Sequence, residues 1–288
     1  DTAYLQPIEI WAVRANDKAP FAKADISQKE IEKVNLGQDI PFILNQTPSV
    51  VVNSDAGNGI GYTGIRIRGT DGTRINVTLN GIPYNDVESQ ATYWVDLPDF
   101  ASSANSIQIQ RGVGTSSNGG GAFGATINVG TNELNKKFYA EANNSYGSYN
   151  LWKNTIKFGS GLIGKHFTID GRLSNISSDG YIERAKTALR SYYLSTAWTD
   201  ENNSVRVNIF SGKERTYQAW DGVPQDSLAT NRRYNTAGTE KPGKPYENQV
   251  DDYLQTHYQF FYNHQWNAYW KTNIAFFLTR GKGYYEQY

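Results

Sequence analysis

Short runs of alternating apolar and polar residues, each ended by a glycine or a tight turn, follow one another between residues 65 and 129. They are Ile65–Gly69, Ile75–Pro83, Ser106–Gly112 and Gly121–Val129. Alternation with a period of two, interrupted by turns, is typical of half-buried strands. The four runs therefore predict one small domain built around short strands.

Longer alternating segments begin after Asn132, and seven of them can be counted. Residues such as Thr168, Asp170, Arg172 and Ser174 separate the apolar positions and predict a polar face. A soluble sandwich alternates in the same way, so the period alone leaves two fold classes open. The candidate lipid-facing residues, segment by segment, are Phe138, Ala140, Ala142; Trp152, Ile156, Phe158; Phe167, Ile169, Leu173; Tyr192, Leu194, Trp198; Val205, Val207, Ile209; Tyr258, Phe260, Tyr262, Trp266; and Trp270, Ile274, Phe276, Leu278.

The links between these segments alternate in length. Outer-membrane barrels have short periplasmic turns and long outer loops. The pattern therefore favours a transmembrane β-barrel whose long loops lie outside. The short links are Ser160–Gly164, Thr199–Ser204 and Asn267–Ala268, and the other links are Gly147–Ser148, Ser177–Leu189 and Gly212–Tyr253.

Composition agrees with a barrel. The chain has 20 Tyr, 12 Phe and 7 Trp, yet its mean hydropathy is −0.62. Many aromatic residues in a polar chain are expected where aromatic girdles flank the membrane and the lumen is polar. Lys+Arg and Asp+Glu are 28 each, which gives no indication of nucleic-acid binding. Cysteine is absent, which excludes disulfides and thiolate metal sites.

Two short helices and a strand are predicted before residue 65. Ser27-Gln-Lys-Glu30 is a capping-box pattern, so a helix through Ile31 should follow. Gln38–Leu44 reads as a second helical turn with a proline near its start. Val50–Val52 should begin a strand. No apolar run is long enough for a membrane-spanning helix, and the start of the chain lacks the features of a signal peptide, so a mature form is expected.

The turns at Ile67–Gly69, Leu79–Pro83 and Arg111–Gly112 and the strand Phe123–Asn128 resemble, in their order, the motifs of the plug domain of TonB-dependent outer-membrane receptors. The resemblance implies a membrane β-barrel of about 22 strands with an α+β plug in its lumen. It implies an N-terminal segment over residues 1–24, the plug over 25–132 and the first seven barrel strands over 133–288. Seven strands cannot close around such a plug, so we expect the N-terminal portion of a larger receptor.

The segment Pro7–Ala15 precedes the predicted plug. It could be an ordinary edge strand, or an extended segment that a partner captures by strand addition. In the resembling family this is the place of the TonB box, although Trp11 departs from the usual small or β-branched residue. The resemblance assigns contact with a TonB-type periplasmic energy-transducing protein to Ile8, Glu9, Ile10, Trp11, Ala12 and Val13.

Loops supply the candidate ligand contacts. The link after Pro83 has side chains for hydrogen bonding and stacking, and the resemblance places it at the plug apex below the ligand. Gly212–Tyr253 is expected to be a long outer loop whose aromatic and guanidinium groups suit a chelate or a sugar. The candidates are Tyr84, Asn85, Asp86, Glu88, Gln90, Tyr93 and Trp94 at the plug apex, and Tyr217, Trp220, Arg232, Arg233 and Tyr234 in the outer loop.

Arg68 and Arg111 end strands in the middle of the predicted plug. A charge buried between plug and wall needs partners. In the resembling family, arginines of these two motifs pair with glutamates of the barrel and hold the plug in place. The same role is expected of Arg68 and Arg111, with partners that can lie beyond residue 288.

Other chemistries find little support. Gly59, Gly61 and Gly64 match G-x-G-x-x-G, but a strand follows where a dinucleotide site needs a helix. No catalytic motif occurs, so we expect no enzyme. His257 and His264 should face opposite sides of one strand, and His166 should lie on another strand, so neither a metal site nor a cofactor is expected.

The resemblance favours active uptake of a scarce ligand across the outer membrane of a Gram-negative bacterium, with a ferric siderophore or other iron chelate as the commonest cargo. Glycan, haem and cobalamin import remain alternatives. A secreted adhesin or lectin, or a sensor or scaffold that does not transport, remains from other classes. Expected partners are the TonB-type protein, outer-membrane lipid and a small-molecule ligand, and a surface lipoprotein is a further partner that the family allows.

Overall fold

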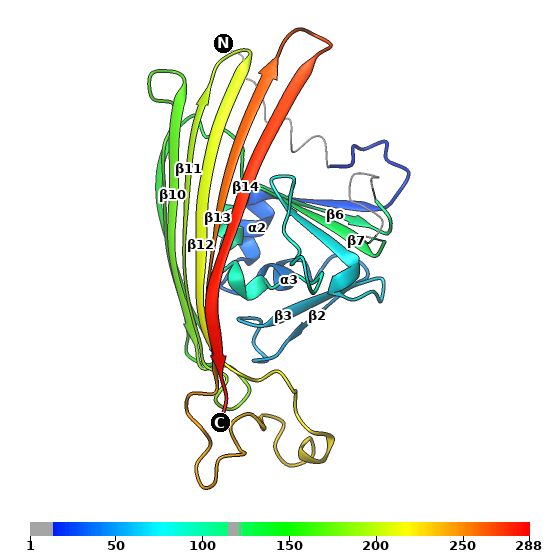
Figure 1. Ribbon diagram of the computed structural model, residues 1–288, viewed down its shortest axis with the longest axis vertical. Helices are drawn as coiled ribbons and strands as arrows, with labels where there is room; N and C mark the ends of the chain where they lie inside the picture. Colours follow the sequence, from blue (N-terminus) through cyan, green and yellow to red (C-terminus); the bar gives the residue numbers. More distant parts are fainter. Residues whose placement is uncertain (1–13, 115–120, 122) are drawn as a thin grey trace.

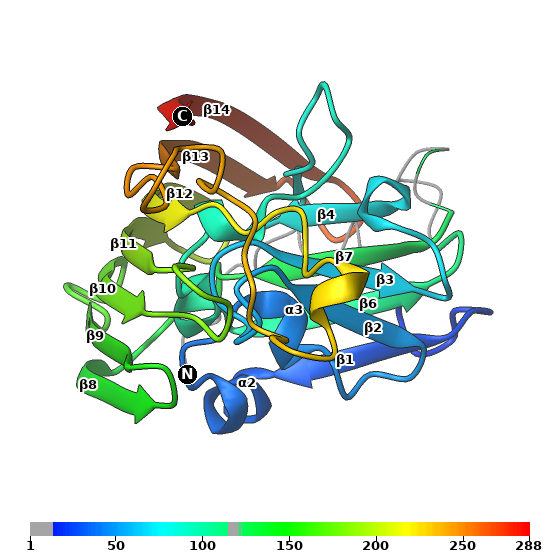
Figure 2. The ribbon, with the colours of Figure 1, turned by 90° about the horizontal axis from the view of Figure 1, so that it is seen from below.

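The computed structural model describes residues 14–114, 121 and 123–288. Two parts are visible in Figure 1, and we call them the N-terminal part, residues 14–132, and the long sheet, residues 138–286. The long sheet curves along one side of the N-terminal part, as the view from below in Figure 2 shows. The short strands and helices lie on its concave side.

The N-terminal part contains a five-stranded sheet in the order β1-β6-β7-β4-β5, and a separate pair, β2 and β3. Strands β4 and β7 run parallel, and the other neighbours are antiparallel. The elements are β1 (Lys23–Ser27), α2 (Gln28–Val34), α3 (Ile40–Ile43), β2 (Val50–Ser54), β3 (Thr63–Ile67), η1 (Gly72–Arg74), β4 (Ile75–Leu79), β5 (Ile82–Pro83), η2 (Trp94–Asp96), η3 (Phe100–Ser103), β6 (Ser106–Arg111) and β7 (Ala125–Gly130).

Local sequence explains where these elements start and turn. The backbone N–H of Ser27 donates to the Glu30 carboxylate at 2.8 Å, so the predicted capping box begins α2. Asn80 and Gly81 have φ values of 58° and 84°. Positive φ at both central residues fits the tight two-residue turn between β4 and β5. The motif Leu79–Pro83 is therefore a hairpin.

Both faces of β6 and β7 are buried, so the prediction of half-buried strands is wrong for these two. Ile107 and Ile109 fill one face. On the other face, the Gln108 amide donates to the Ala15 carbonyl at 3.0 Å and to Asp25 at 2.6 Å. Arg14 and Ala15 lie over this second face. Strand β1, which the sequence analysis did not identify, pairs with β6 in the same sheet.

The core of the N-terminal part continues into the long sheet. Phe100 lies with its ring centroid 5.0 Å from that of Phe210 and 6.3 Å from that of Tyr193. All three side chains are buried and belong to one apolar cluster with Ile107 and Ile127. The two parts are therefore packed against each other through a shared core.

The long sheet is an antiparallel meander in which each strand pairs with the next one in the sequence. Thr168, Asp170, Arg172 and Ser174 are buried, whereas Leu173, between Arg172 and Ser174, is exposed. This alternation confirms the predicted polar inner face and apolar outer face. The strands are β8 (Phe138–Gly147), β9 (Leu151–Ser160), β10 (Phe167–Ser178), β11 (Thr187–Thr199), β12 (Asn203–Tyr217), β13 (Val250–Gln265) and β14 (Lys271–Glu286).

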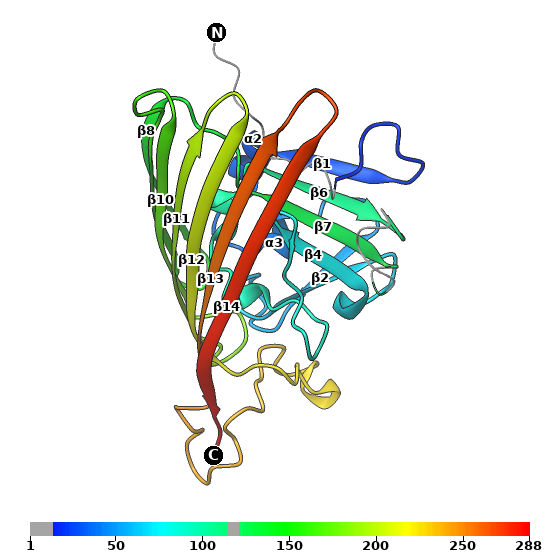
Figure 3. The same ribbon diagram turned by 45° about the horizontal axis from the view of Figure 1, so that its top comes forward.

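Short turns lie at one end of the long sheet and longer connections at the other (Figure 3). The longest connection, residues 218–249, is named the long loop. It is shorter than predicted because β12 and β13 remain paired as far as Tyr217 and Val250. Tyr217, which was expected in the loop, thus ends a strand. His166 lies in a turn before β10, not on a strand. No helix in the described ranges is long and apolar enough to cross a membrane.

Candidate functional site

A cavity of about 610 Å³ lies between the N-terminal part and strands β12 to β14, near the long-loop end of the sheet. We call it the loop-side cavity. The apical loop, residues 84–93, forms one wall, and side chains of β13 form another. The lining includes Tyr62, Tyr84, Asn85, Asp86, Tyr93, Asp96, Glu214, Asp251, Tyr253, Gln255 and His257.

The apical loop is held at its base by one side chain. The Asn85 amide oxygen accepts from the Val77 N–H at 2.7 Å, and its nitrogen donates to the carbonyls of Ile75 and Gln90, each at 2.9 Å. Asp86 accepts from the Ser89 N–H at 2.7 Å and so closes a turn within the loop. Both predicted ligand residues thus have structural contacts already.

Tyr84 connects the apical loop to strand β13 of the long sheet. Its hydroxyl lies 3.3 Å from the Gln255 amide oxygen and 3.1 Å from the Tyr93 carbonyl, to which it can donate. Its ring centroid is 5.4 Å from that of His257. Burial raises the pKa of the Tyr84 hydroxyl, so it remains a neutral donor.

Carboxylates gather at the other side of the loop-side cavity. Asp96 ends η2, and Glu214 and Asp251 project from β12 and β13. The Tyr62 hydroxyl donates to Asp251. Burial, together with the charges of Asp251 and Asp86, raises the pKa of Asp96 to about 7. This end of the cavity is therefore strongly acidic in character.

The other predicted apical residues lie elsewhere. Trp94 is only 2% exposed and belongs to the core of the N-terminal part. Glu88 and Gln90 lie on the exposed part of the apical loop and do not line the cavity. The structure thus gathers Tyr84, Asn85, Asp86 and Tyr93 at one cavity, where the sequence grouped all seven residues.

A buried ionic contact that the sequence analysis missed joins the two parts. The Asp99 carboxylate lies 2.8 Å from the Lys153 ammonium and 3.7 Å from the Arg172 guanidinium. Thr155 and Ser174 also donate to it. Burial acts to raise the pKa of Asp99, but Arg172 and Lys153 outweigh it and hold the pKa at about 2. Asp99 is therefore ionised and bound to the wall.

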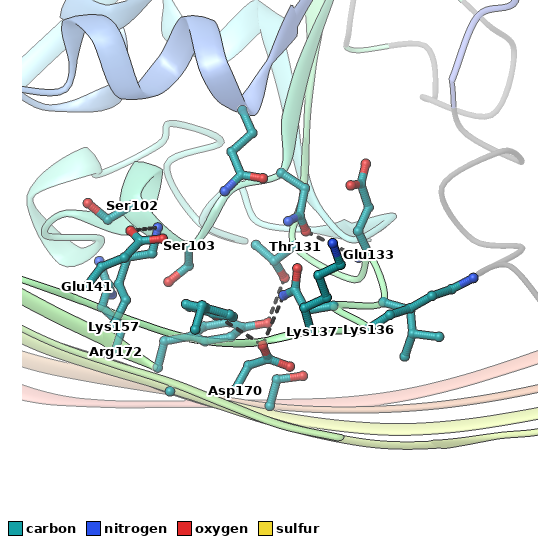
Figure 4. Close-up of a pocket in the computed structure, with 18 of the residues that line it drawn as sticks. Ser102, Ser103, Thr131, Glu133, Lys136, Lys137, Glu141, Lys157, Asp170 and Arg172 are labelled. Carbon is teal, nitrogen blue, oxygen red and sulfur yellow. Dashed lines mark hydrogen bonds and ion pairs between the residues drawn. The ribbon is translucent and has the colours of Figure 1, made fainter. Parts of the chain in front are cut away.

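A second cavity, of about 450 Å³, lies toward the short-turn end of the sheet. Figure 4 shows it, with Asp170 projecting from the long sheet toward the connection that carries Thr131, Lys136 and Lys137. Asp170 accepts from Asn135 at 2.9 Å and from the Tyr139 hydroxyl at 3.0 Å. Asn135 thus ties the connection between the two parts to the long sheet, and Tyr139 joins Asp170 from within that sheet.

Arg111 ends β6 at the end of that strand that points away from the long sheet (Figure 1), and the Arg68 guanidinium lies close to Gly112, the residue after Arg111. Arg111 donates to the Pro48 carbonyl at 3.2 Å. Within residues 14–114 and 123–288, neither arginine pairs with an acidic side chain. Their role in locking the plug stays a prediction.

Three of the predicted outer-loop residues mainly support the loop itself. The Tyr217 hydroxyl donates to the Tyr246 carbonyl at 2.6 Å. Arg233 donates to the Tyr181 carbonyl at 2.6 Å, and Arg232 donates to the Leu228 carbonyl at 3.3 Å. Trp220 differs, because its ring lies 5.5 Å from that of Tyr62 in an edge-on contact. Tyr234, at the fourth position of its turn, is partly buried.

The glycine-rich segment at residues 57–64 does not open a helix. Strand β3 follows directly from Thr63, which excludes the dinucleotide fingerprint. Gly59 accepts from the Asp39 N–H through its carbonyl at 2.9 Å, and Asn58 donates to Ser178 of the long sheet at 2.7 Å. The segment thus links helix α3 to the wall.

Two further predictions concern metal binding and the start of the chain. Among the described residues, no group of three or more His, Asp or Glu side chains is placed to hold a metal ion. The segment Ile8, Glu9, Ile10, Trp11, Ala12 and Val13 lies outside the described residues.

Comparisons with known proteins identify the domain in the N-terminal part. Residues 15–126 match the family model described as TonB-dependent Receptor Plug Domain. No curated protein matches the sequence. Among solved structures, the alcaligin outer-membrane receptor FauA from Bordetella pertussis is 16% identical, with a TM-score of 0.67 over 93% of this chain and 40% of that one.

Two other solved structures have a similar fold. The ferric citrate transporter FecA, in its unliganded form, is 19% identical with a TM-score of 0.72, over 94% of this chain and 41% of that one. The ferric yersiniabactin uptake receptor FyuA from Yersinia pestis is 11% identical with a TM-score of 0.73, over 92% and 42%. The chain thus spans about 40% of the length of such receptors.

TonB-dependent receptors are transporters, not enzymes, and they reside in the outer membrane of Gram-negative bacteria. The chain matches them over both of its parts, since the family model covers the N-terminal part and the solved structures extend over the long sheet. Residues 15–126 are thus a TonB-dependent receptor plug domain, and they are followed by seven antiparallel strands that match the N-terminal portion of the barrel of these receptors.

Proposed function

We propose that the chain serves in the active import of a scarce ligand across the outer membrane, and that the ligand is an iron chelate such as a ferric siderophore. The loop-side cavity carries this proposal, because it lies between the plug and the wall on the side of the long loop. The similar solved structures are those of an alcaligin receptor, a ferric citrate transporter and a ferric yersiniabactin uptake receptor.

The residues proposed to contact ligand follow from the same cavity. Tyr84, Asn85, Asp86 and Tyr93 line it, and Trp220 lies at its rim beside Tyr62. Glu88, Gln90, Arg232, Arg233 and Tyr234 stay candidates for first contact on exposed loops. Arg68 and Arg111 are proposed to bind wall residues outside the seven strands, which would fix the plug on its far side.

A TonB-type protein is the proposed energy source. It would capture Ile8–Val13 by strand addition, because main-chain hydrogen bonds of an extended segment give affinity without a folded site. Outer-membrane lipid is the proposed neighbour of the exposed outer-face residues Phe158, Leu173 and Phe276. A surface lipoprotein would be a further partner at the long loop.

The test uses the full-length receptor in cells that lack the chromosomal copy and are starved of iron. Uptake of radioactive iron would be measured from hydroxamate, catecholate and citrate chelates. We expect uptake of at least one chelate, with loss of uptake but retained cell-surface binding after deletion of residues 8–13. Absence of both uptake and binding for all the chelates would overturn the iron-chelate proposal.

The alternative functions are tested in different ways. A soluble adhesin or lectin sandwich is wrong, because the seven strands form one curved sheet with an apolar outer face. Glycan, haem and cobalamin import use the same architecture and are tested by replacing the chelates with those ligands. A sensor without transport would bind ligand, and deletion of residues 8–13 would leave ligand accumulation unchanged.

A further inference from the structure

The described lining of the loop-side cavity has acidic side chains without lysine or arginine. Asp86, Asp96, Glu214 and Asp251 line it, and no lysine or arginine occurs among its described lining residues. Asp99, at another place in this interface, has cationic partners in Lys153 and Arg172. The loop-side cavity differs from that place in having acidic side chains without a cation among its described lining residues.

Glu214 is the strongest indication that the cavity binds a ligand. It is 1% exposed, and neither carboxylate oxygen has a hydrogen-bond partner among the described residues. A buried carboxylate without a donor or a cation is unfavourable in a folded protein. Because Glu214 lines the cavity, a donor-bearing cation in the cavity would satisfy it.

Aromatic rings surround the same space. Tyr62, Tyr84 and Tyr253 line the cavity together with His257. Rings that accompany carboxylates recognise organic cations, because the ring face attracts a positive charge. Tyr62 has its hydroxyl engaged by Asp251, so its position is fixed.

A bare metal ion fits less well than an organic cation. Metal ions need several oxygen or nitrogen ligands converging on one point, and no such group of side chains exists among the described residues. A cavity of about 610 Å³ instead has room for a substantial part of a small molecule. Its carboxylates can therefore accept from several N–H groups at separate places.

We propose that the loop-side cavity binds a protonated amine or guanidinium group of the transported ligand, so that the receptor selects amine-bearing ligands over anionic ones. This inference rests on the proposed import function and narrows its ligand class. A chelate whose iron centre is neutral and whose tail ends in an ammonium group fits the cavity. A ferric tris-catecholate, with its net negative charge, would be repelled by the ionised carboxylates of the cavity.

Matched ligand pairs test the inference with the purified full-length receptor. The first pair is a linear trihydroxamate iron chelate with a terminal primary amine and its N-acetylated form. The second pair is a glucosamine oligosaccharide and its fully N-acetylated form. Each pair keeps its shape and differs mainly in positive charge. Affinity would be measured by isothermal titration calorimetry.

We expect the amine form to bind at least about tenfold more tightly than the acetylated form. Glu214→Gln should reduce binding of the amine form toward that of the acetylated form and leave the acetylated form unchanged. Asp252→Asn is the matched control. Asp252 is the neighbour of Asp251 in β13 but pairs with Lys213 and Arg215 away from the cavity, so its replacement should change neither affinity.

The outcomes separate the two proposals. An amine preference in the sugar pair alone would keep the cation site and overturn iron-chelate import. Equal binding of both forms in every pair that binds, no binding in either pair, or an amine preference that Glu214→Gln leaves intact would overturn the cation site. Glu214→Gln keeps the size and shape of the side chain, so the variant should fold, and unchanged heat-modifiable migration on gels would verify this.

Discussion

Asp99 combines a left-handed backbone, with φ of 53°, and a carboxylate that is completely buried. Its partners Lys153 and Arg172 are each at most 2% exposed in their side chains. Buried ion pairs add little net stability compared with apolar replacements, but removal of one partner leaves uncompensated charge. Asp99 therefore fixes where the plug sits more than it adds stability.

Asp99→Asn should destabilise the plug against the wall by about 3–5 kcal/mol, because two buried cations lose their counterion. Thermal unfolding of the purified full-length receptor would measure the change, with Asp252→Asn as a surface control. A variant as stable as the wild type would show that water or a shift of Lys153 replaces the carboxylate.

The ionic contact of Asp99 also makes the stability of the receptor depend on pH in the acid range. Because the pKa of Asp99 is lowered to about 2, its stabilising contribution is present above the pKa of an unfolded aspartate, about 3.9, and is lost as the pH falls toward 2. Unfolding measured from neutral pH downward should show this loss only below about pH 4. A steep loss already between pH 7 and 5, absent in Asp99→Asn, would contradict the assignment.

Asp96 behaves in the opposite way, since burial, Asp251 and Asp86 raise its pKa to about 7. Asp96 is largely neutral at about pH 6 and must lose a proton before it can pair with a cation. Amine-bearing ligand should therefore bind about tenfold more tightly at about pH 8 than at about pH 6. Glu214, Tyr62, Tyr84 and His257 face the same cavity, so Asp96→Asn is needed to show that this residue causes the slope, which it should flatten.

At the scale of elements, alternation was the most informative signal. Leu194 lies on the outer face of β11 between Gly171 and Ile209, and it is 39% exposed. Leu194→Lys should cost about 2–4 kcal/mol if this position faces the membrane midplane, while Leu194→Phe should be tolerated. The yield of folded, heat-modifiable receptor in outer-membrane fractions measures both. Equal yields would mean that this face is covered by protein instead of lipid.

Sequence predicted the elements better than their contacts. Glycine-ended runs located β3 to β7 because turns with positive φ need such residues. β1 was missed because Lys23–Ser27 has only two apolar residues, and it is a strand through its pairing with β6. The ionic contact of Asp99 was also missed, since sequence shows neither the register of β9 and β10 nor which polar inner residue meets the plug.

Candidate site residues show the same limit. Asn85 and Trp94 were chosen for their chemistry, yet Asn85 holds the base of the apical loop and Trp94 fills the core. Glu214 and Asp251 were not chosen, because alternation places many polar residues on the inner face alike. Only the plug packed against the wall shows which of them share a cavity.

At the scale of the whole molecule, the plug contacts the wall at several separate places. One of them is the 2.7 Å hydrogen bond from Asn58 to Ser178 near the long-loop end. These 288 residues contain no cysteine, so cysteines introduced at 58 and 178 would meet no competing thiol within this part of the receptor. The disulfide would hold this segment of the plug to the wall.

Under oxidising conditions, the doubly substituted full-length receptor should bind ligand but import it at least about tenfold more slowly, with recovery after reduction. Each single cysteine variant is the control. Undiminished import by the oxidised receptor would show that residue 58 remains beside the wall while ligand passes. Uptake of the ligand identified for the wild type, with and without a reductant, provides the measurement.

The buried contact of Asp99 also has a consequence for biogenesis. Asn35 precedes Asp99, and the other side-chain partners, Ser102, Lys153, Thr155, Arg172 and Ser174, lie within the next 75 positions of the sequence. These contacts therefore require only the plug and the long sheet as far as β10. We therefore expect the plug to dock on the first strands while the barrel is still being assembled, so that the later strands close around a plug already in place.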